Sequence, residues 1–172
     1  YLLGEVWEDG SNKIAYSHRR RYLLGRETHG LMNYPFRTAL LAWLDGGDAA
    51  DFRHAMECIR ENYPPAAFYG AMNFLGTHDT ARILTLLGAE QVPEQKTERA
   101  AYRLSPQELD RGRRRLRLAG MLLYCFPGSP TLYYGDEAGM QGFEDPLNRR
   151  TYPWGGEDAV LLDFFRQLGR LR

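Results

Sequence analysis

The sequence predicts an α/β fold in which four short parallel strands alternate with helices. Apolar runs of strand length recur along the chain, each is followed by a segment that can form a helix, and polar clusters come directly after three of the runs. Ligand sites of parallel α/β folds lie at the carboxyl ends of the strands, so a site is expected where these clusters meet. Four strand–helix units make half of a (β/α)8 barrel, and we expect residues 1–172 to form a single domain.

The first part of the chain holds three of the expected strands. The apolar runs that predict them are 1–6, 30–34 and 71–75. Pro35 stops the second run. Two segments, 36–45 and 48–62, are expected to be helices, and the second ends before Pro64 and Pro65. Residues 11–25 mix basic and aromatic positions, with an arginine run at 19–21, and are expected to be a loop or a short helix.

The second part of the chain holds the fourth expected strand at 131–134. Helices are expected over 81–88, 105–126 and 158–172. The middle one begins at Ser105-Pro106, a capping residue followed by proline at the first helical position, with Glu108 in the first turn. Residues 89–104 form a polar excursion, and 139–156 form a loop rich in Gly, Pro and Asn.

The charge balance argues against a nucleic-acid or membrane-surface role, because 22 basic and 22 acidic residues cancel. The arginines between 111 and 117 are expected on the solvated face of a helix whose other face is apolar. Cys58 and Cys125 are expected to be buried, reduced thiols, which fits a cytoplasmic location. Neither a secretory leader nor an apolar run of spanning length is apparent, and no metal or cofactor motif is found.

Three polar clusters carry candidate chemistry. Glu5 and Trp7 follow the first strand, where a carboxyl beside an indole suits a general acid; the alternative is a surface acidic turn. His78 and Asp79 follow the third strand, where they suit sugar hydroxyls and an oxocarbenium-like transition state. The alternative there is that Asp79 or Thr80 caps the next helix and that His78 is a buried, satisfied histidine.

The third cluster lies in the loop after the fourth strand. Asp145 and Arg149 are four residues apart and can share hydroxyl groups between them; the alternative is a plain salt-bridged loop.

Taken together, the motifs resemble the α-amylase family of glycoside hydrolases. Four segments resemble the fifth to eighth barrel strands of that family in order and spacing: 4–9 (Gly-Glu-Val-Trp-Glu-Asp), 31–36 (Leu-Met-Asn-Tyr-Pro-Phe), 74–80 (Phe-Leu-Gly-Thr-His-Asp-Thr) and 128–137 (Gly-Ser-Pro-Thr-Leu-Tyr-Tyr-Gly-Asp-Glu). The stretch 32–36 and the loop 145–149 are typical of the neopullulanase, cyclomaltodextrinase and maltogenic amylase group. The resemblance implies the C-terminal half, strands 5–8, of a (β/α)8 TIM barrel.

The resemblance also implies roles for single residues. Glu5 matches the general acid/base, and Asp79 matches the carboxylate that stabilises the transition state. Five further residues match sugar-contacting positions: Trp7, Asn33, His78, Asp145 and Arg149. The implied substrates are maltooligosaccharides, cyclodextrins or pullulan, cleaved with retention at α-1,4 and possibly α-1,6 bonds.

One departure from the family pattern is chemically important. The family's nucleophile is an aspartate in a Gly-x-Arg-x-Asp motif at the fourth strand, and this sequence contains no such motif. We therefore expect the parent protein to be a glycosidase and residues 1–172 alone to be inactive, because a retaining mechanism needs two carboxyls. The alternative is a non-catalytic carbohydrate-binding module. We further expect self-association, since half a barrel has open edges, here near 1–3 and 131–133.

Overall fold

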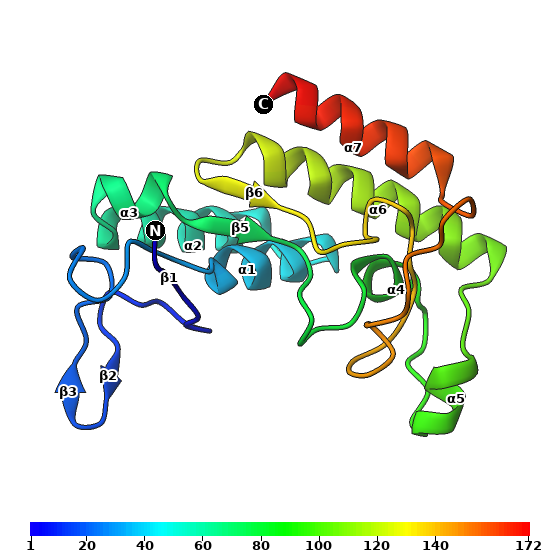
Figure 1. Ribbon diagram of the computed structural model, residues 1–172, viewed down its shortest axis with the longest axis horizontal. Helices are drawn as coiled ribbons and strands as arrows, with labels where there is room; N and C mark the ends of the chain where they lie inside the picture. The colour runs from blue at the N-terminus through cyan, green and yellow to red at the C-terminus, as the bar shows by residue number, and fades with distance from the viewer. The chain divides into compact units, whose positions relative to one another are not determined.

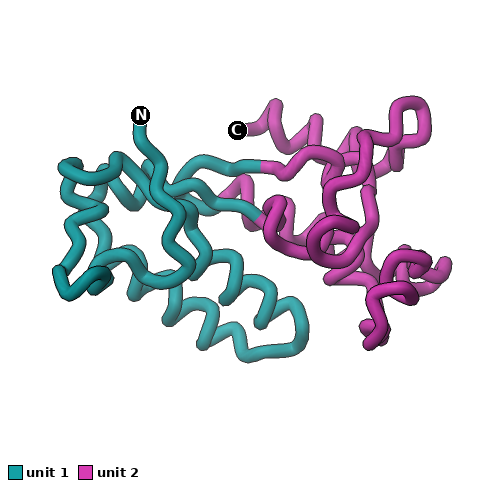
Figure 2. The backbone as a smooth tube through the Cα atoms, turned by 60° about the horizontal axis from the view of Figure 1, so that its bottom comes forward, with its two compact units in different colours: residues 1–74, 126–131 teal, residues 75–125, 132–172 magenta.

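The computed structural model describes all 172 residues, which divide into two compact units. Unit 1 comprises residues 1–74 and 126–131, and unit 2 comprises residues 75–125 and 132–172 (Figure 2). The chain passes from one unit to the other three times, so each unit is built from two separate stretches of sequence.

The parallel strands all lie in unit 1. They are β1 (Leu3–Gly4), β4 (Gly30–Leu31), β5 (Met72–Phe74) and β6 (Ser129–Thr131). β1 pairs with β4, β5 pairs with β6, and a parallel bridge between Met32 and Met72 joins the two pairs. The order β1–β4–β5–β6 follows the chain, and β5 and β6 lie side by side in Figure 1. β6 begins two residues before the strand predicted at 131–134.

An antiparallel hairpin follows β1, where the sequence predicted a loop or a short helix. Its strands are β2 (Ile14–Ala15) and β3 (His18–Arg19). The two turn residues, Tyr16 and Ser17, have φ of 53° and 62°. Such left-handed pairs usually read Asn-Gly in sequence, and Tyr-Ser carries no comparable turn signal, which explains why the hairpin escaped prediction.

Helices α1 (Tyr34–Leu44), α2 (Ala49–Asn62) and α3 (Pro65–Tyr69) complete unit 1. The side chains of Asn33 and Asp48 accept backbone N–H groups at the starts of α1 and α2. Buried Phe36 of α1 packs on Phe126 with ring centroids 5.0 Å apart. The short α3 was not predicted, because its two prolines indicated an end rather than a beginning of a helix.

A buried amide chain connects the strands of unit 1. Asn73 on β5 is fully buried, and its Oδ1 accepts from Nδ2 of Asn33, 2.8 Å away. Its Nδ2 donates to the carbonyl of Pro127 at 2.9 Å. Gly128, next along the chain, adopts φ 124°, and a Cβ there would lie 2.6 Å from Nδ2 of Asn73. The segment before β6 is therefore held against β5 by a fit that admits only glycine.

Unit 2 consists of four helices and the loops between them. The helices are α4 (Ile83–Gly88), α5 (Lys96–Ala101), α6 (Pro106–Cys125) and α7 (Ala159–Leu171). The first, third and fourth match predicted helices, whereas α5 lies in the predicted polar excursion. α6 packs on α4 at Gly112, where a Cβ would lie 3.0 Å from Leu84. On α7, three apolar residues at helical spacing are buried: Leu161, Phe165 and Leu168.

The start of α6 is a reciprocal cap. The Ser105 hydroxyl accepts the Glu108 N–H, and the Glu108 carboxylate accepts the Ser105 N–H at 2.8 Å. The same carboxylate accepts the Tyr102 hydroxyl at 2.5 Å and the Glu90 N–H at 2.9 Å. These donors, the Tyr102 hydroxyl above all, lower the pKa of Glu108 from 4.5 to about 2. Burial of the Tyr102 phenol raises its pKa to about 12, and the hydrogen bond to Glu108 adds to this effect.

Three of the arginines on α6 form ion pairs, in keeping with the predicted solvated face. Arg111 pairs with Glu90 at 2.7 Å, Arg113 with Asp158 at 2.6 Å and Arg114 with Asp110 at 3.0 Å. Their charge is thus largely balanced within unit 2.

The cysteines differ from expectation in one respect. Both are free thiols, but Cys125 is exposed and Cys58 is half-buried, so the prediction of two buried thiols is wrong. Each lies on a helix whose buried face is formed by other residues, such as Met56 and Leu123. No helix is long and apolar enough to cross a membrane.

We expect the Glu108 cap to make stability depend on pH. The folded carboxylate stays ionised down to pH of about 2, whereas the unfolded one takes up its proton near 4.5. Its contribution is therefore complete above pH of about 5 and is lost as pH falls through this window. Denaturant unfolding of wild type and Glu108→Gln should show a stability difference that narrows between pH 5 and 2. Exposed Glu94→Gln serves as the control, and a pH-independent difference for Glu108→Gln would contradict the assignment.

Candidate active site

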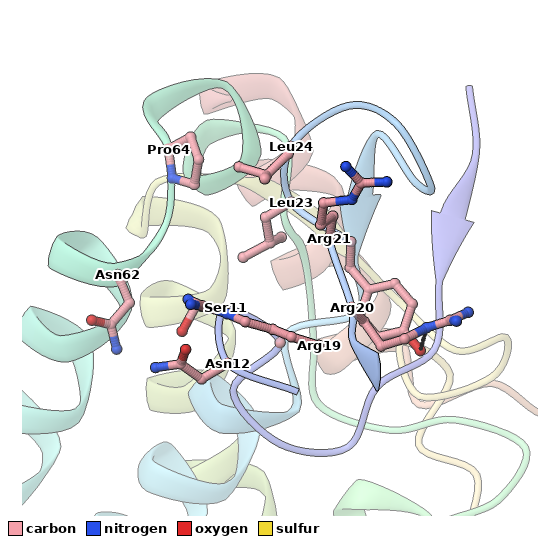
Figure 3. Close-up of a pocket in the computed structure, with 11 residues that line it drawn as sticks. Ser11, Asn12, Arg19, Arg20, Arg21, Leu23, Leu24, Asn62 and Pro64 are labelled. Carbon is pink, nitrogen blue, oxygen red and sulfur yellow. Dashed lines mark hydrogen bonds between the residues drawn. The ribbon is translucent and has the colours of Figure 1, made fainter. Parts of the chain in front are cut away.

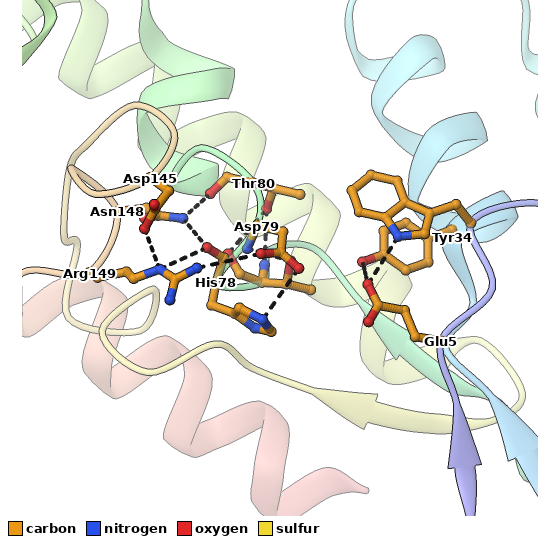
Figure 4. Close-up of polar contacts among 10 residues, drawn as sticks. Glu5, Tyr34, His78, Asp79, Thr80, Asp145, Asn148 and Arg149 are labelled. Atoms are coloured by element: carbon orange, nitrogen blue, oxygen red, sulfur yellow. Dashed lines mark hydrogen bonds and ion pairs between the residues drawn. The ribbon is translucent and has the colours of Figure 1, made fainter.

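Glu5 lies directly after β1 and is anchored through one of its two oxygens. Its Oε1 accepts the indole N–H of Trp7 at 3.0 Å and the hydroxyl of Tyr34 at 3.3 Å (Figure 4). The Trp7 ring stacks on the Tyr34 ring at 4.2 Å, with 18° between the planes. Tyr34 is 2% exposed and meets Phe74 edge-on, whereas Trp7 is 54% exposed. The buried ring of Tyr34 thus supports the exposed ring of Trp7.

The two carboxyl oxygens of Glu5 differ in their contacts. Both hydrogen bonds that the side chain accepts, from Trp7 and from Tyr34, go to Oε1 and not to Oε2. A carboxyl held in this way can present one oxygen to a reacting group without rotating. The acidic-turn alternative fits Glu8 and Asp9 instead, since Glu8 pairs with Lys13 and Asp9 accepts the Ser11 N–H.

Asn33 has a different place from the one expected. It was predicted to contact sugar, but it is 2% exposed, and both ends of its amide are used inside the protein. Its Oδ1 accepts the Phe36 N–H at 3.1 Å, and its Nδ2 donates to Asn73. Asn33 therefore starts α1 and thereby sets the position of Tyr34; this framework role replaces the predicted sugar contact.

The other predicted residues gather in unit 2, on two loops. Nε2 of His78 lies 3.3 Å from Oδ2 of Asp79, and the Arg149 guanidinium lies 3.5 Å from Oδ1 of Asp79 (Figure 4). Arg149 also pairs with Asp145 at 2.6 Å. All four side chains are partly exposed, so they form a rim of polar groups that is open to solvent. Such a rim offers both donors and acceptors to vicinal hydroxyl groups.

The structure does not contain the helix cap or the buried histidine that were the alternatives for His78 and Asp79. Helix α4 begins after Arg82 without a side-chain cap, so neither Asp79 nor Thr80 caps it. The Thr80 hydroxyl instead accepts the Thr77 N–H within the turn. His78 is exposed rather than buried. The loop salt bridge between Asp145 and Arg149 does exist, but Arg149 extends beyond it to Asp79.

Asn148 fastens the two loops together. It is fully buried, and its Nδ2 donates to the carbonyls of His78 and Thr80, each 2.8 Å away. Nε of Arg149 adds a bond to the His78 carbonyl at 3.2 Å. The backbone that carries Asp79 is therefore held from the side of the 145–149 loop.

Arg82 supports this clamp from within unit 2. Its guanidinium is 1% exposed, donates to the Asn148 carbonyl at 2.8 Å and pairs with Asp136 at 3.1 Å. It also donates to the Tyr134 carbonyl and lies over the Tyr133 ring, 4.3 Å from its centroid. Two atoms here, the Arg82 Nη2 and the Asn148 Oδ1, are buried without a protein partner.

Sequence reasoning missed Tyr34, Arg82 and Asn148 as contributors to the site. Each lies within or next to a motif that the sequence analysis identified. The only sequence signal for their role was therefore their closeness to Asn33, Asp79 and Arg149. Their partners lie far away in sequence, which local patterns do not reveal. No group of three or more histidine, cysteine or carboxylate side chains is placed to hold a metal ion.

Comparisons with known proteins agree with the motifs. The family described as alpha amylase, catalytic domain, matches residues 1–159. An amylopullulanase of Thermoanaerobacter thermohydrosulfuricus is 39% identical over 99% of this chain and 11% of its own length. A cyclomaltodextrinase of Geobacillus thermopakistaniensis is 31% identical over 100% of this chain and 25% of its own.

A solved structure of a related hydrolase is also similar to this chain. The ligand-free cyclic α-maltosyl-(1→6)-maltose hydrolase from Arthrobacter globiformis has a TM-score of 0.76 at 28% identity and covers 99% of this chain. The chain covers 32% of that structure. The chain thus spans 11%, 25% and 32% of the lengths of these three relatives.

We expect Asn148→Ala to destabilise unit 2. The change leaves the buried Thr80 carbonyl without its Asn148 donor, and the His78 carbonyl keeps only its bond from Arg149. A buried unsatisfied group costs about 1–3 kcal/mol. Urea unfolding monitored by far-UV circular dichroism would measure the loss. Gln91→Ala, at an exposed position, is the control and should change stability by less than about 0.5 kcal/mol. Equal effects of the two substitutions would show that the clamp contributes nothing.

Proposed function

This chain belongs to the α-amylase family. We propose that it carries the acid/base carboxyl and the sugar-holding carboxylate of a retaining α-glucoside hydrolase. The observation that carries the proposal is the anchoring of Glu5 by Trp7 and Tyr34 at the end of β1. The proposed substrates are α-1,4-linked maltooligosaccharides, cyclodextrins and pullulan, with α-1,6 bonds included. Support for them comes from the names of relatives: an amylopullulanase and a cyclomaltodextrinase.

In this proposal Glu5 protonates the glycosidic oxygen as the bond to the leaving sugar breaks. Its Oε2 is the oxygen that carries the proton, because Oε1 already accepts two hydrogen bonds. The same group then removes a proton from water in the second step. The exposed face of Trp7 offers a flat surface on which a sugar ring can pack.

We assign the second cluster to sugar binding. Asp79 has one oxygen toward His78 and the other toward Arg149, so its charge is directed and its position is fixed. Such a carboxylate can accept hydroxyl groups of the sugar and stabilise positive charge that develops at the anomeric carbon. Arg149 and Asp145 would hold the neighbouring sugar between donor and acceptor.

A retaining mechanism also needs a nucleophilic carboxylate about 5–5.5 Å from the acid. Asp79 already binds His78 and Arg149, and residues 1–172 contain no Gly-x-Arg-x-Asp motif. We therefore assign the nucleophile to a part of the parent protein outside these residues. Residues 1–172 alone are then a site that binds sugar without hydrolysing it.

The four parallel strands support assignment of the chain as the second half, strands 5–8, of a (β/α)8 barrel. β1 and β6 each pair on one side only. A hollow of about 390 Å³ lies against this sheet and is lined by Tyr1, Leu3, Met72 and Thr131. In a closed barrel the facing strands would fill such a hollow. In the isolated chain we propose that a second copy fills it, since Tyr1 is 80% and Leu2 61% exposed.

The acid assignment predicts the effect of Glu5→Gln in the full-length enzyme. Glutamine keeps an oxygen for Trp7 and Tyr34 to donate to but cannot protonate the leaving group. We expect hydrolysis of maltotriose to fall by about 10²–10⁴-fold with KM little changed. Glu8→Gln, on the neighbouring acidic turn, should leave turnover intact. Near-normal turnover by Glu5→Gln would refute the assignment.

Self-association predicts a light-scattering mass for residues 1–172 above that of one chain, 19.8 kDa. Leu2→Lys places a charge at the open edge and should shift the protein toward monomer. Leu24→Lys, at an equally exposed position away from that edge, should not. A well-folded wild-type monomer at all concentrations tested would exclude this association.

A further inference from the structure

A pocket with several polar and basic residues in its lining lies in unit 1, beside the β2–β3 hairpin. It has a volume of about 470 Å³, within the range of small-ligand sites. Its lining includes the arginine run 19–21, three polar side chains (Ser11, Asn12 and Asn62) and two leucines. Figure 3 shows Ser11, Asn12 and Asn62 on one side of the pocket and Arg20 and Arg21 on the other. Neither Glu5 nor Trp7 belongs to this lining.

The backbone explains how three consecutive arginines line one pocket. In an extended strand, neighbouring side chains point to opposite faces, so three in a row would not converge. Here β3 ends at Arg19, and the Arg20 N–H donates to the Lys13 carbonyl at 2.8 Å. The chain then turns, with the Leu24 N–H donating to the Arg21 carbonyl at 3.2 Å. All three arginines thereby belong to the lining of the same hollow.

The charge of the pocket is positive and only partly balanced. No carboxylate lines it. Arg20 is held by Glu27 at 3.5 Å and by the Tyr22 hydroxyl at 3.3 Å. Arg19 and Arg21 are exposed, and neither guanidinium forms an ion pair. Asp9, the nearest acid in sequence to the polar side, is occupied by the Ser11 N–H and by the Asn62 amide at 2.8 Å.

We propose that this pocket binds a sugar that carries an anionic group, either a phosphate ester or a carboxylate. The guanidinium groups of Arg19 and Arg21 match the oxygens of either anion. Asn12, Asn62 and Ser11 supply amide and hydroxyl partners for sugar hydroxyls. Leu23 and Leu24 provide apolar surface for the C–H face of the ring. The proposal does not depend on glycosidase activity, because Glu5 and Asp79 take no part in it.

Titration calorimetry on the full chain would test the proposal with four probes: glucose 6-phosphate, glucuronate, glucose and inorganic phosphate. We expect at least one anionic sugar to bind about tenfold or more tightly than both glucose and inorganic phosphate, and its affinity to fall as salt is raised. Preference for glucose 6-phosphate or for glucuronate would identify the anionic group. Equal binding of glucose and the anionic sugars would overturn the proposal, as would inorganic phosphate binding as tightly as the best sugar.

Matched variants locate the binding. Arg19→Gln combined with Arg21→Gln should weaken the anionic sugar by about tenfold or more. Arg60→Gln, an exposed arginine of α2 outside the lining, should leave affinity unchanged. Hydrolysis by the full-length enzyme should be unchanged in the double variant, which separates this pocket from the Glu5 site. Unaltered affinity in the double variant, or an equal loss in Arg60→Gln, would show that the pocket is not the binding site.

Discussion

Unit 1 depends on the hydrogen bonds of one buried side chain, Asn73. An amide enclosed in a strand must find partners, and this one finds them on the segments to either side. It accepts from Asn33 at the end of β4 and donates to Pro127 just before β6. Because Asn33 also begins α1, the same bond fixes the first residue of that helix, Tyr34. The hydroxyl that Glu5 accepts is therefore positioned by an interaction two steps away in the core.

In unit 2 a buried charged side chain, Arg82, fixes the positions of neighbouring segments. Arg82 is surrounded by Asp136, two tyrosine rings and two carbonyls, and one of those carbonyls belongs to Asn148. A buried ion pair is a weak source of stability, since desolvation offsets most of its attraction. Its value here is geometric: the planar guanidinium admits few arrangements of the loop that Asn148 and Arg149 occupy. The direction of Asp79 follows from that restriction.

The strands, the main helices and the family were predictable because each depends on residues that are close together in the sequence. Apolar runs, caps such as Ser105 and motifs at strand ends all involve neighbours in sequence. What escaped prediction required distant partners or unusual backbone. Tyr34 reaches Glu5 across 29 positions, and Asn148 reaches the His78 carbonyl across 70. Asn33 was misplaced for the same reason, since its decisive partner lies in another strand.

The interleaving of the two units has a consequence for how the protein is made. A ribosome delivers the chain from its N-terminus, and domains commonly fold as they emerge. Here the β5–β6 pairing and the Asn73–Pro127 bond cannot form until α4, α5 and α6 have been synthesised. Closing that long loop is entropically costly, and contacts of this kind slow folding. Until then one edge of β5 stays unpaired in the first stretch of unit 1, and an unpaired strand edge is a surface on which other chains can add a strand.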